Sequence, residues 1–202
     1  MITIIDYGMG NLGSIINMLG KIGVEAVSTS KIEDIEKARK IILPGVGSFD
    51  TAINNLNKLG LMTVLNKKVT EERIPTLGLC LGMQLLTEKS EEGKLPGLGW
   101  IRGRTIRFKF EDNLKIPHMG WNTINIKKRS PLLRGLDNGS RFYFVHSYHL
   151  VCDDEKDILA TADYGYEFPT VVERKNVLGV QFHPEKSHKF GMKLLENFAK
   201  NY

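Results

Sequence analysis

The chain has 202 residues, of which 42% are hydrophobic, and this is enough to bury a sizeable core. No apolar stretch reaches the roughly 18 residues of a membrane span, and MITIIDYG lacks the basic start of a signal peptide. Two cysteines, Cys80 and Cys152, are too few for a disulfide framework, so a cytoplasmic protein is expected. The net charge of +5 comes from scattered basic residues without a recognition motif, so solvated faces are expected and nucleic-acid or membrane binding is not.

The first 90 residues alternate apolar runs with helical patterns. The runs predict strands at 2–7, 24–29, 40–45 and 76–80, and the patterns predict helices at 11–23, 32–38, 48–60 with a continuation to Arg73, and 81–90. KIILPG is continuously apolar, as is typical of a strand covered on both faces. This order predicts an α/β fold with a mostly parallel, doubly wound sheet and helices on both faces.

The pattern changes after residue 93. Six strand-like runs separated by short turns are expected at 98–108, 121–127, 141–151, 158–165, 169–175 and 177–183, with a hairpin turn at RKNV and a last helix from Lys189 to Tyr202. Several of these runs alternate, which predicts an antiparallel β extension in the C-terminal half. No linker separates the halves, so residues 1–202 are expected to form a single domain.

GMGNLG, at residues 8–13, matches the dinucleotide-binding pattern G-x-G-x-x-G after a strand. That pattern requires an acidic residue at the end of the second strand, whereas the strand here ends in VSTS, and Glu33 lies in the next predicted helix. A tight turn with Asn11 capping the following helix explains the glycines with fewer assumptions.

Cys80 lies in GLCLG, between a predicted strand and a predicted helix. The G-x-C-x-G spacing is typical of a nucleophile elbow, in which glycines avoid clashes of a sharp turn with neighbouring backbone. A helix N-terminus favours the thiolate, and the N–H of Leu81 would face the oxygen of an attacked carbonyl. The alternative is a small buried core residue.

A thiol nucleophile needs a base, and His183 in VLGVQFHPEKS follows an apolar strand that Pro184 ends. Glu185 could orient the imidazole, although a lone histidine can also be structural. ILPGVGSF, at residues 42–49, follows another strand and is a candidate oxyanion loop, or only a turn.

The ordered motifs DYGMGNLGS, PGVGSF, GLCLGMQLL, PHMGWN, YFVHSY and GVQFHPEKS resemble those of class I, triad-type glutamine amidotransferases. More closely, they are similar to glutaminase subunits of imidazole glycerol phosphate synthase. The resemblance covers nearly the whole chain and implies a flavodoxin-like sheet and glutamine hydrolysis through a γ-glutamyl thioester, with no metal or other cofactor.

The resemblance also implies a role for each matching residue. Cys80, His183 and Glu185 would be the catalytic triad. Val46, Gly47 and Leu81 would form the oxyanion site, and Gly47, Gln84, Ser147 and Tyr148 would bind glutamine. Asn11, Trp121, Tyr143 and Lys186 match positions at or near a partner interface.

The implied partner is a (β/α)₈-barrel synthase subunit that forms a heterodimer with the glutaminase and receives ammonia from it. The products would be imidazole glycerol phosphate and an aminoimidazole nucleotide, AICAR, in histidine biosynthesis. Three alternatives stay open: the same chemistry serving a paralogous sugar-amidinating synthase of surface-glycan synthesis, a cysteine hydrolase or peptidase, and a non-catalytic binding subunit.

Overall fold

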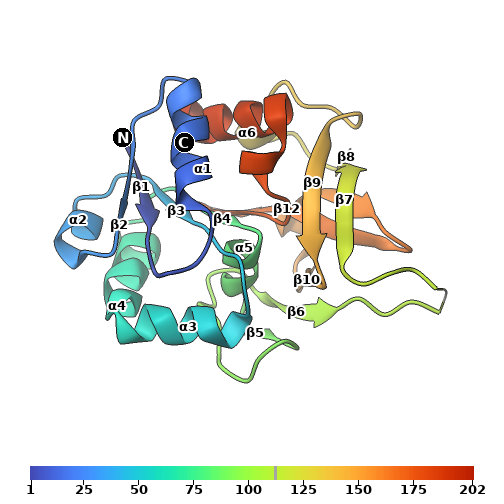
Figure 1. Cartoon of the computed structure of the whole chain (residues 1–202), viewed down its shortest axis with the longest axis horizontal. Helices are drawn as coiled ribbons and strands as arrows, with labels where there is room; N and C mark the ends of the chain where they lie inside the picture. The colour runs from blue at the N-terminus through green and yellow to red at the C-terminus, as the bar shows by residue number, and fades with distance from the viewer. Residues whose placement is uncertain (112) are drawn as a thin grey trace.

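In residues 1–111 and 113–202, which the computed structural model describes, an eight-stranded sheet has the order β2-β1-β3-β4-β13-β12-β11-β8 (Figure 1). Its strands are β1 (Ile2–Ile5), β2 (Ala26–Thr29), β3 (Ile41–Leu43), β4 (Thr76–Leu79), β8 (Asn125–Ile126), β11 (Ile158–Asp163), β12 (Glu167–Arg174) and β13 (Val177–Val180). From β2 to β13 neighbouring strands are parallel, and from β13 to β8 they are antiparallel. The predicted fold class is therefore confirmed.

Helices cover both faces of the sheet. They are α1 (Leu12–Lys21), α2 (Ile32–Glu36), α3 (Phe49–Lys58), α4 (Leu61–Asn66), α5 (Leu81–Leu85) and α6 (His188–Asn201). Buried residues of α1 and α6 share one hydrophobic cluster with one side of the sheet, and those of α2 to α5 share another with the opposite side (Figure 1). The parallel strands β1, β3, β4 and β13 are buried along their whole length, because both of their faces are covered.

The longer helices follow the spacing that the sequence predicts. Each buries residues three and four positions apart, which form one apolar face: Phe49, Ala52, Ile53 and Leu56 in α3, and Gly191, Leu194, Leu195 and Phe198 in α6. The predicted continuation to Arg73 is α4 followed by a π-helical turn at Lys67–Glu71. The predicted hairpin turn joins β12 to the antiparallel β13.

Two smaller sheets complete the C-terminal half. One has the order β10-β6-β5 and consists of β5 (Lys89–Ser90), β6 (Gly103–Arg107) and β10 (Tyr148–Cys152). The other pairs β7 (His118–Thr123) with β9 (Arg141–His146), which lie side by side in Figure 1. The pairs β6–β10 and β7–β9 are antiparallel, and with β8, β11 and β12 of the large sheet they form the predicted antiparallel extension, whereas β5 runs parallel to β6.

Two predicted elements are shorter than expected because they bond to each other. The helix predicted at 81–90 ends at Leu85, and the strand predicted at 98–108 is regular only in β6. The backbone N–H of Leu98 donates to the Leu85 carbonyl at 2.8 Å, so the segment before β6 satisfies carbonyls that the end of α5 leaves free. The residues after α5 form β5 instead, which pairs with β6.

Two predicted strands are divided between sheets. The run at 141–151 breaks at Ser147 into β9 and β10, and the run at 121–127 breaks at Ile124 into β7 and β8. Alternation of apolar residues describes each strand but does not say which neighbour it pairs with, so these breaks are not visible in the sequence. The break at Ser147 matters for function, because Ser147 and Tyr148 line the site described below.

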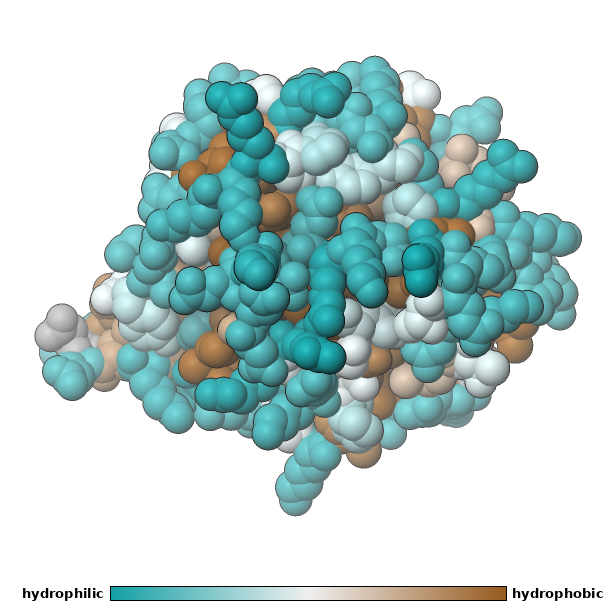
Figure 2. Space-filling view, turned by 180° about the vertical axis from the view of Figure 1, so that it is seen from behind, coloured by the Kyte–Doolittle hydropathy of each residue, from teal (hydrophilic) through white to brown (hydrophobic). Residues whose placement is uncertain are grey.

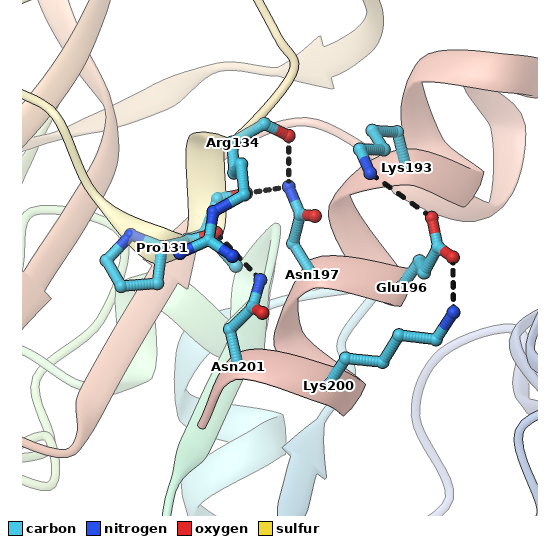
Figure 3. A network of polar contacts seen from close by, with 8 residues as sticks. Pro131, Arg134, Lys193, Glu196, Asn197, Lys200 and Asn201 are labelled. Atoms are coloured by element: carbon cyan, nitrogen blue, oxygen red, sulfur yellow. Dashed lines mark hydrogen bonds and ion pairs between the residues drawn. The ribbon is translucent and has the colours of Figure 1, made fainter.

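The last helix, α6, is hydrogen-bonded to the 3-10 turn Pro131–Leu133 (Figure 3). Asn197 Nδ2 donates to the Leu132 carbonyl at 2.9 Å and to the Arg134 carbonyl at 2.7 Å. On the exposed side of the helix, Glu196 pairs with two lysines of the same helix. Because the buried amide serves two carbonyls, it fixes where α6 lies along this turn.

The molecule seen from behind in Figure 2 is covered mostly by hydrophilic side chains, and its hydrophobic areas are small and separated. Among the residues that the structure describes, no helix is both long enough and apolar enough to cross a membrane.

The position of β13 matters most for function. This late strand lies beside the early strand β4, with Val180 opposite Leu79, and the N–H of Cys80 donates to the Val180 carbonyl at 2.8 Å. The ends of β4 and β13 therefore meet at the same edge of the sheet, and β3 ends there also.

We expect Gly82→Ala to lower the free energy of unfolding by about 1–3 kcal/mol or more, because a Cβ at Gly82 would lie 1.9 Å from the Leu43 carbonyl oxygen. Urea unfolding followed by circular dichroism measures this loss. Gly20→Ala is the matched control, because nothing lies within 4 Å of its added Cβ and a helical alanine should stabilise by about 0.5–1 kcal/mol. Equal stability of the Gly82→Ala and wild-type proteins would contradict the packing described here.

Candidate active site

A cavity of about 250 Å³ lies where β3, β4 and β13 end. Catalytic groups gather at this edge of parallel sheets because the strands aim their last residues at one crevice. The cavity wall contains many of the predicted site residues: Val46, Gly47, Cys80, Leu81, Gln84, Ser147, Tyr148, His183 and Lys186. Residues from both halves of the chain thus meet in one site.

Cys80 occupies a strained turn between β4 and α5, with φ 51° and ψ −108°. Cysteine rarely adopts a positive φ, and such strain persists where the surrounding structure enforces it. The two flanking glycines provide that enforcement: a Cβ at Gly78 would lie 2.7 Å from the Gly82 backbone, and Gly82 faces the end of β3 in the same way. Leu81 begins the helix, where a backbone N–H has no partner within the helix.

His183 and Glu185 form a buried pair beside the turn. His183 Nδ1 lies 2.7 Å from Glu185 Oε1, and each side chain is only 3% exposed. Because a carboxylate only accepts, the Nδ1 nitrogen carries the proton, and the Nε2 nitrogen is left for other chemistry. The carboxylate therefore fixes the orientation of the ring.

Two opposing effects set the pKa of His183. Burial lowers it, but the negative charge of the Cys80 thiolate and the Glu185 carboxylate outweigh burial and raise it to about 10. The imidazole is therefore protonated at neutral pH when the thiolate lies beside it. An imidazolium next to a thiolate is a ready nucleophile with a ready proton donor.

The candidate oxyanion loop packs directly against the turn. A Cβ at Gly45 would lie 2.8 Å from both the Gly82 nitrogen and the Leu81 Cβ. Tyr7 donates its hydroxyl to the Pro44 carbonyl, and burial raises the pKa of Tyr7 above its ordinary value, so the hydroxyl keeps its proton. The loop is thus held firmly at its start.

The next two residues of this loop are less constrained. Val46 is 51% exposed, and Gly47 has a φ of 124°, which side chains rarely allow. Glycine adopts other backbone angles at little conformational cost, so the backbone at Gly47 is easier to rearrange than one that carries a side chain.

Of the four predicted glutamine-binding residues, Gly47 is in the oxyanion loop, and Gln84, Ser147 and Tyr148 line the same cavity. Gln84 Nε2 donates to the Tyr148 carbonyl at 2.9 Å and to Gln181 Oε1 at 3.1 Å. Ser147 is the single residue between β9 and β10, and Tyr148 is the first residue of β10. The structure therefore brings the three predicted residues together.

Three of the four predicted interface residues lie beside one another. Trp121, 46% exposed, lies edge-on to Tyr143, with ring centroids 6.0 Å apart, and Lys186 Nζ lies 5.6 Å from the centre of the Tyr143 ring. Asn11 lies at the start of α1, where its Oδ1 accepts the N–H of Ser14 at 3.2 Å. That capping bond is the one the sequence predicts.

The structure explains why two positions of GMGNLG are glycines. Gly8 and Gly10 have φ values of 79° and 92°, and a Cβ at Gly10 would lie 3.0 Å from the Pro44 side chain. The motif is thus explained by a tight turn that packs against the oxyanion loop.

The sequence analysis missed several side chains near the site. Gln181 Nε2 lies 3.7 Å from Cys80 Sγ, His146 lines the cavity, and Glu92 contributes a carboxylate to its wall. Burial raises the pKa of Glu92, although the N–H of Phe49 bonds to its carboxylate. Gln181 precedes His183 by two residues in an extended run, and this spacing was a usable signal for a shared face. No local sequence pattern indicates that Glu92 lies at the site.

Within residues 1–111 and 113–202, no group of three or more His, Cys, Asp or Glu side chains is placed to hold a metal ion.

We expect Cys80→Ser to lower the pKa of His183 by roughly 1–3 units, the usual effect of one adjacent opposite charge. The loss of the thiolate removes a contribution that raises this pKa and leaves burial, which lowers it. An NMR titration of the His183 ring measures the change. Cys152→Ser is the matched control, because burial and neighbouring aspartates raise the pKa of that thiol to about 12 and keep it uncharged. An unchanged His183 pKa in Cys80→Ser would show that the sulphur carries no charge beside the ring.

This chain is similar over nearly its whole length to a described family and to named proteins. The sequence pattern of the family described as glutamine amidotransferase class-I matches residues 3–202. A protein of Methanococcus maripaludis named imidazole glycerol phosphate synthase subunit HisH 2 is 58% identical over 99% of both chains. The subunit named HisH 1 of the same organism is 50% identical over 98% of both chains.

A solved structure of a glutamine amidotransferase superposes with a TM-score of 0.77 at 22% identity, covering 98% of this chain and 97% of the other. That likeness concerns the fold alone. The family match over residues 3–202 and the two relatives together establish that this chain belongs to the class-I glutamine amidotransferase family.

Proposed function

We propose that residues 1–202 act as one glutaminase domain in which Cys80 attacks glutamine and the released ammonia passes to a separate synthase subunit. The observation that carries this proposal is the meeting of a strained Cys80 with the buried His183–Glu185 pair in one cavity. The names of the HisH relatives support the synthesis of imidazole glycerol phosphate, in histidine biosynthesis, as the process that is served.

In the first step, the Cys80 thiolate forms a bond to the side-chain amide carbon of glutamine, and the carbonyl electrons move to oxygen. The N–H groups of Leu81 and Val46 stabilise that oxyanion. When the intermediate collapses, the carbon–nitrogen bond breaks, and the His183 imidazolium gives its proton to the leaving nitrogen. Ammonia leaves, and a γ-glutamyl thioester remains on Cys80.

In the second step, the now neutral His183 takes a proton from water as the water oxygen attacks the thioester carbon. The carbon–sulphur bond then breaks, which returns the electron pair to the thiolate and releases glutamate. The imidazolium and thiolate are restored together. Glu185 keeps the ring in one orientation throughout, because it holds Nδ1.

The substrate fits the wall of the cavity. Gln84, Gly47 and the backbone at Ser147 and Tyr148 bind the amino-acid part of glutamine, whose carboxylate and ammonium need several polar partners. The Glu92 carboxylate lies on the same wall and complements an ammonium group. A cavity of about 250 Å³ suits a small amino acid rather than a peptide, which disfavours a peptidase.

The partner is a (β/α)₈-barrel synthase subunit that forms a heterodimer with this chain in the cytoplasm. Its docking face includes Lys186, which lines the cavity, and Tyr143 and Trp121, which follow it in contact, together with Asn11 at the start of α1. Free thiols at Cys80 and Cys152 favour the cytoplasm, where thiols remain reduced.

A second candidate keeps this chemistry and changes the acceptor to a sugar, through a paralogous synthase of surface-glycan synthesis. The observation that favours it is that the chain shares 58% of its residues with HisH 2 of M. maripaludis and 50% with HisH 1. A second copy in one organism is free to serve another synthase.

We expect Cys80→Ala to abolish glutamine hydrolysis while the variant folds and docks normally, because Cys80 is placed for chemistry and not for packing. A coupled assay of glutamate release measures the activity. The synthase partner, mixed with the variant and supplied with ammonium salts, should still make product. Glutamate release by Cys80→Ala at the wild-type rate would refute Cys80 as the nucleophile.

We expect the isolated chain to be a poor glutaminase, and we expect its partner to stimulate it once the partner has bound the acceptor ligand. Rotation of the peptide unit between Gly45 and Val46 would withdraw the N–H of Val46, and one lost oxyanion donor costs about 10²- to 10³-fold in rate. Glutamine turnover is measured for the chain alone, with the partner, and with the partner plus acceptor ligand. Equal turnover in all three would refute the switch. Stimulation by imidazole-pathway ligands supports the first candidate, and stimulation by sugar substrates supports the second.

A further inference from the structure

We propose that His118 and His146, two buried histidines outside the catalytic group, form a relay that positions the Tyr148 carbonyl on the glutamine-binding wall. The relay is a chain of two hydrogen bonds, from His118 to His146 and from His146 to the carbonyl, in which each bond has only one possible donor. They are positioning residues, since they act through the backbone at Tyr148. The proposal rests on the proposed function, because it assigns these residues a part in binding glutamine.

The relay lies on the two-stranded sheet of β7 and β9. His118 is directly opposite His146 in that antiparallel pair, and both side chains are buried. The neighbouring residues of β7 on its other face, Met119 and Trp121, are 62% and 46% exposed. One strand therefore carries the outer docking residues on one face and the relay on the other.

The direction of the first bond follows from the carbonyl. His146 Nδ1 lies 2.8 Å from the Tyr148 carbonyl oxygen, which can only accept, so Nδ1 carries the proton. Burial lowers the pKa of His146 to about 3, so the ring is neutral and its Nε2 nitrogen keeps a lone pair.

The second bond then has one possible direction. His118 Nδ1 lies 3.0 Å from His146 Nε2, and because that nitrogen accepts, His118 Nδ1 must donate. Burial lowers the pKa of His118 to about 4, so its Nε2 is also an acceptor, and Asn122 Nδ2 lies 3.3 Å from it. The Asn122 amide is oriented independently, because Nδ2 donates to the Asp163 carbonyl and Oδ1 accepts the N–H of Thr123.

The other end of the relay reaches the reacting thiol. The Tyr148 carbonyl accepts a second bond from Gln84, whose Nε2 also bonds to Gln181 Oε1. Gln181 Nε2 in turn lies 3.7 Å from Cys80 Sγ. Two donors, from His146 and Gln84, thus hold one carbonyl and fix the peptide plane at the cavity wall.

Aromatic packing alone would explain the burial of His118 without any role for its nitrogens. Its ring stacks on Tyr164, with centroids 4.1 Å apart, and on Phe144, at 4.8 Å. A phenylalanine could make both contacts but could not donate to His146. The two explanations therefore differ in their dependence on the Nδ1 proton.

The first test uses the wild-type chain at neutral pH. Long-range ¹H–¹⁵N NMR spectra of the ¹⁵N-histidine-labelled protein show which ring nitrogen carries the proton. We expect the Nδ1–H form for both His118 and His146. A proton on Nε2 of His146, or a doubly protonated ring, would overturn the relay whatever the variants do.

The second test compares His118→Phe with His118→Asn. The phenylalanine keeps the stacking and loses the donor, so we expect the KM for glutamine to rise about 5- to 10-fold, the effect of one lost hydrogen bond. The asparagine amide places a donor near the position of Nδ1, so its KM should lie within about 2-fold of the wild-type value. An equal KM for both variants, or an unchanged KM in His118→Phe, would overturn the proposal.

His149→Phe is the matched control. His149 is buried in the same aromatic cluster and bonds to the Leu150 carbonyl and to Tyr166, outside the relay. We expect its KM to be unchanged even where stability falls, and a rise equal to that of His118→Phe would overturn the relay. Failure of the wild-type chain with its partner to hydrolyse glutamine would overturn the proposed function, whereas the spectra test the relay in the same sample without catalysis.

Discussion

Close backbone packing around Cys80 is the constraint on which the site depends. The turn after β4 presses against the end of β3 so tightly that Gly45, Gly78 and Gly82 have no room for a Cβ. This contact enforces the positive φ of Cys80 and places the oxyanion loop against the first turn of α5. Local strain is tolerated because the sheet and two hydrophobic clusters hold both elements in place. The same contact that costs conformational energy thus creates the geometry for chemistry.

Electrostatic interactions set the protonation states of the histidines that this packing brings together. Burial disfavours an imidazolium at His183, and the negative charges of a Cys80 thiolate and of the Glu185 carboxylate offset that effect. The nucleophile and the proton donor therefore stabilise each other. The histidines of β7 and β9 behave in the opposite way: burial lowers their pKa values, and they act as neutral hydrogen-bonding groups. The same fold therefore holds one protonated histidine, His183, and two neutral histidines, His118 and His146.

Much of the fold and the centre of the site were predictable, because their signals are local. Apolar runs marked the parallel strands, glycine spacing marked Cys80, and the strand-end H-P-E marked His183. The break at Ser147 and the insertion of β13 between β4 and β12 depend on which strands pair, and no local pattern encodes that. The contacts of Tyr7 and His146 were missed for the same reason, since each partner lies on an element whose neighbour was unknown. The roles of the individual residues stay predictions.

The central claim, that Cys80 forms a covalent bond to the substrate, is tested most directly by trapping the intermediate. The chain and its partner, with the acceptor ligand bound to the partner, are mixed with isotopically labelled glutamine. The reaction is quenched in acid during turnover, and the protein is then digested and analysed by mass spectrometry. The account predicts a γ-glutamyl group on the peptide that contains Cys80, and none on the same peptide of Cys80→Ser. A label on the peptide that contains Cys152, or turnover with no labelled peptide at all, would contradict it.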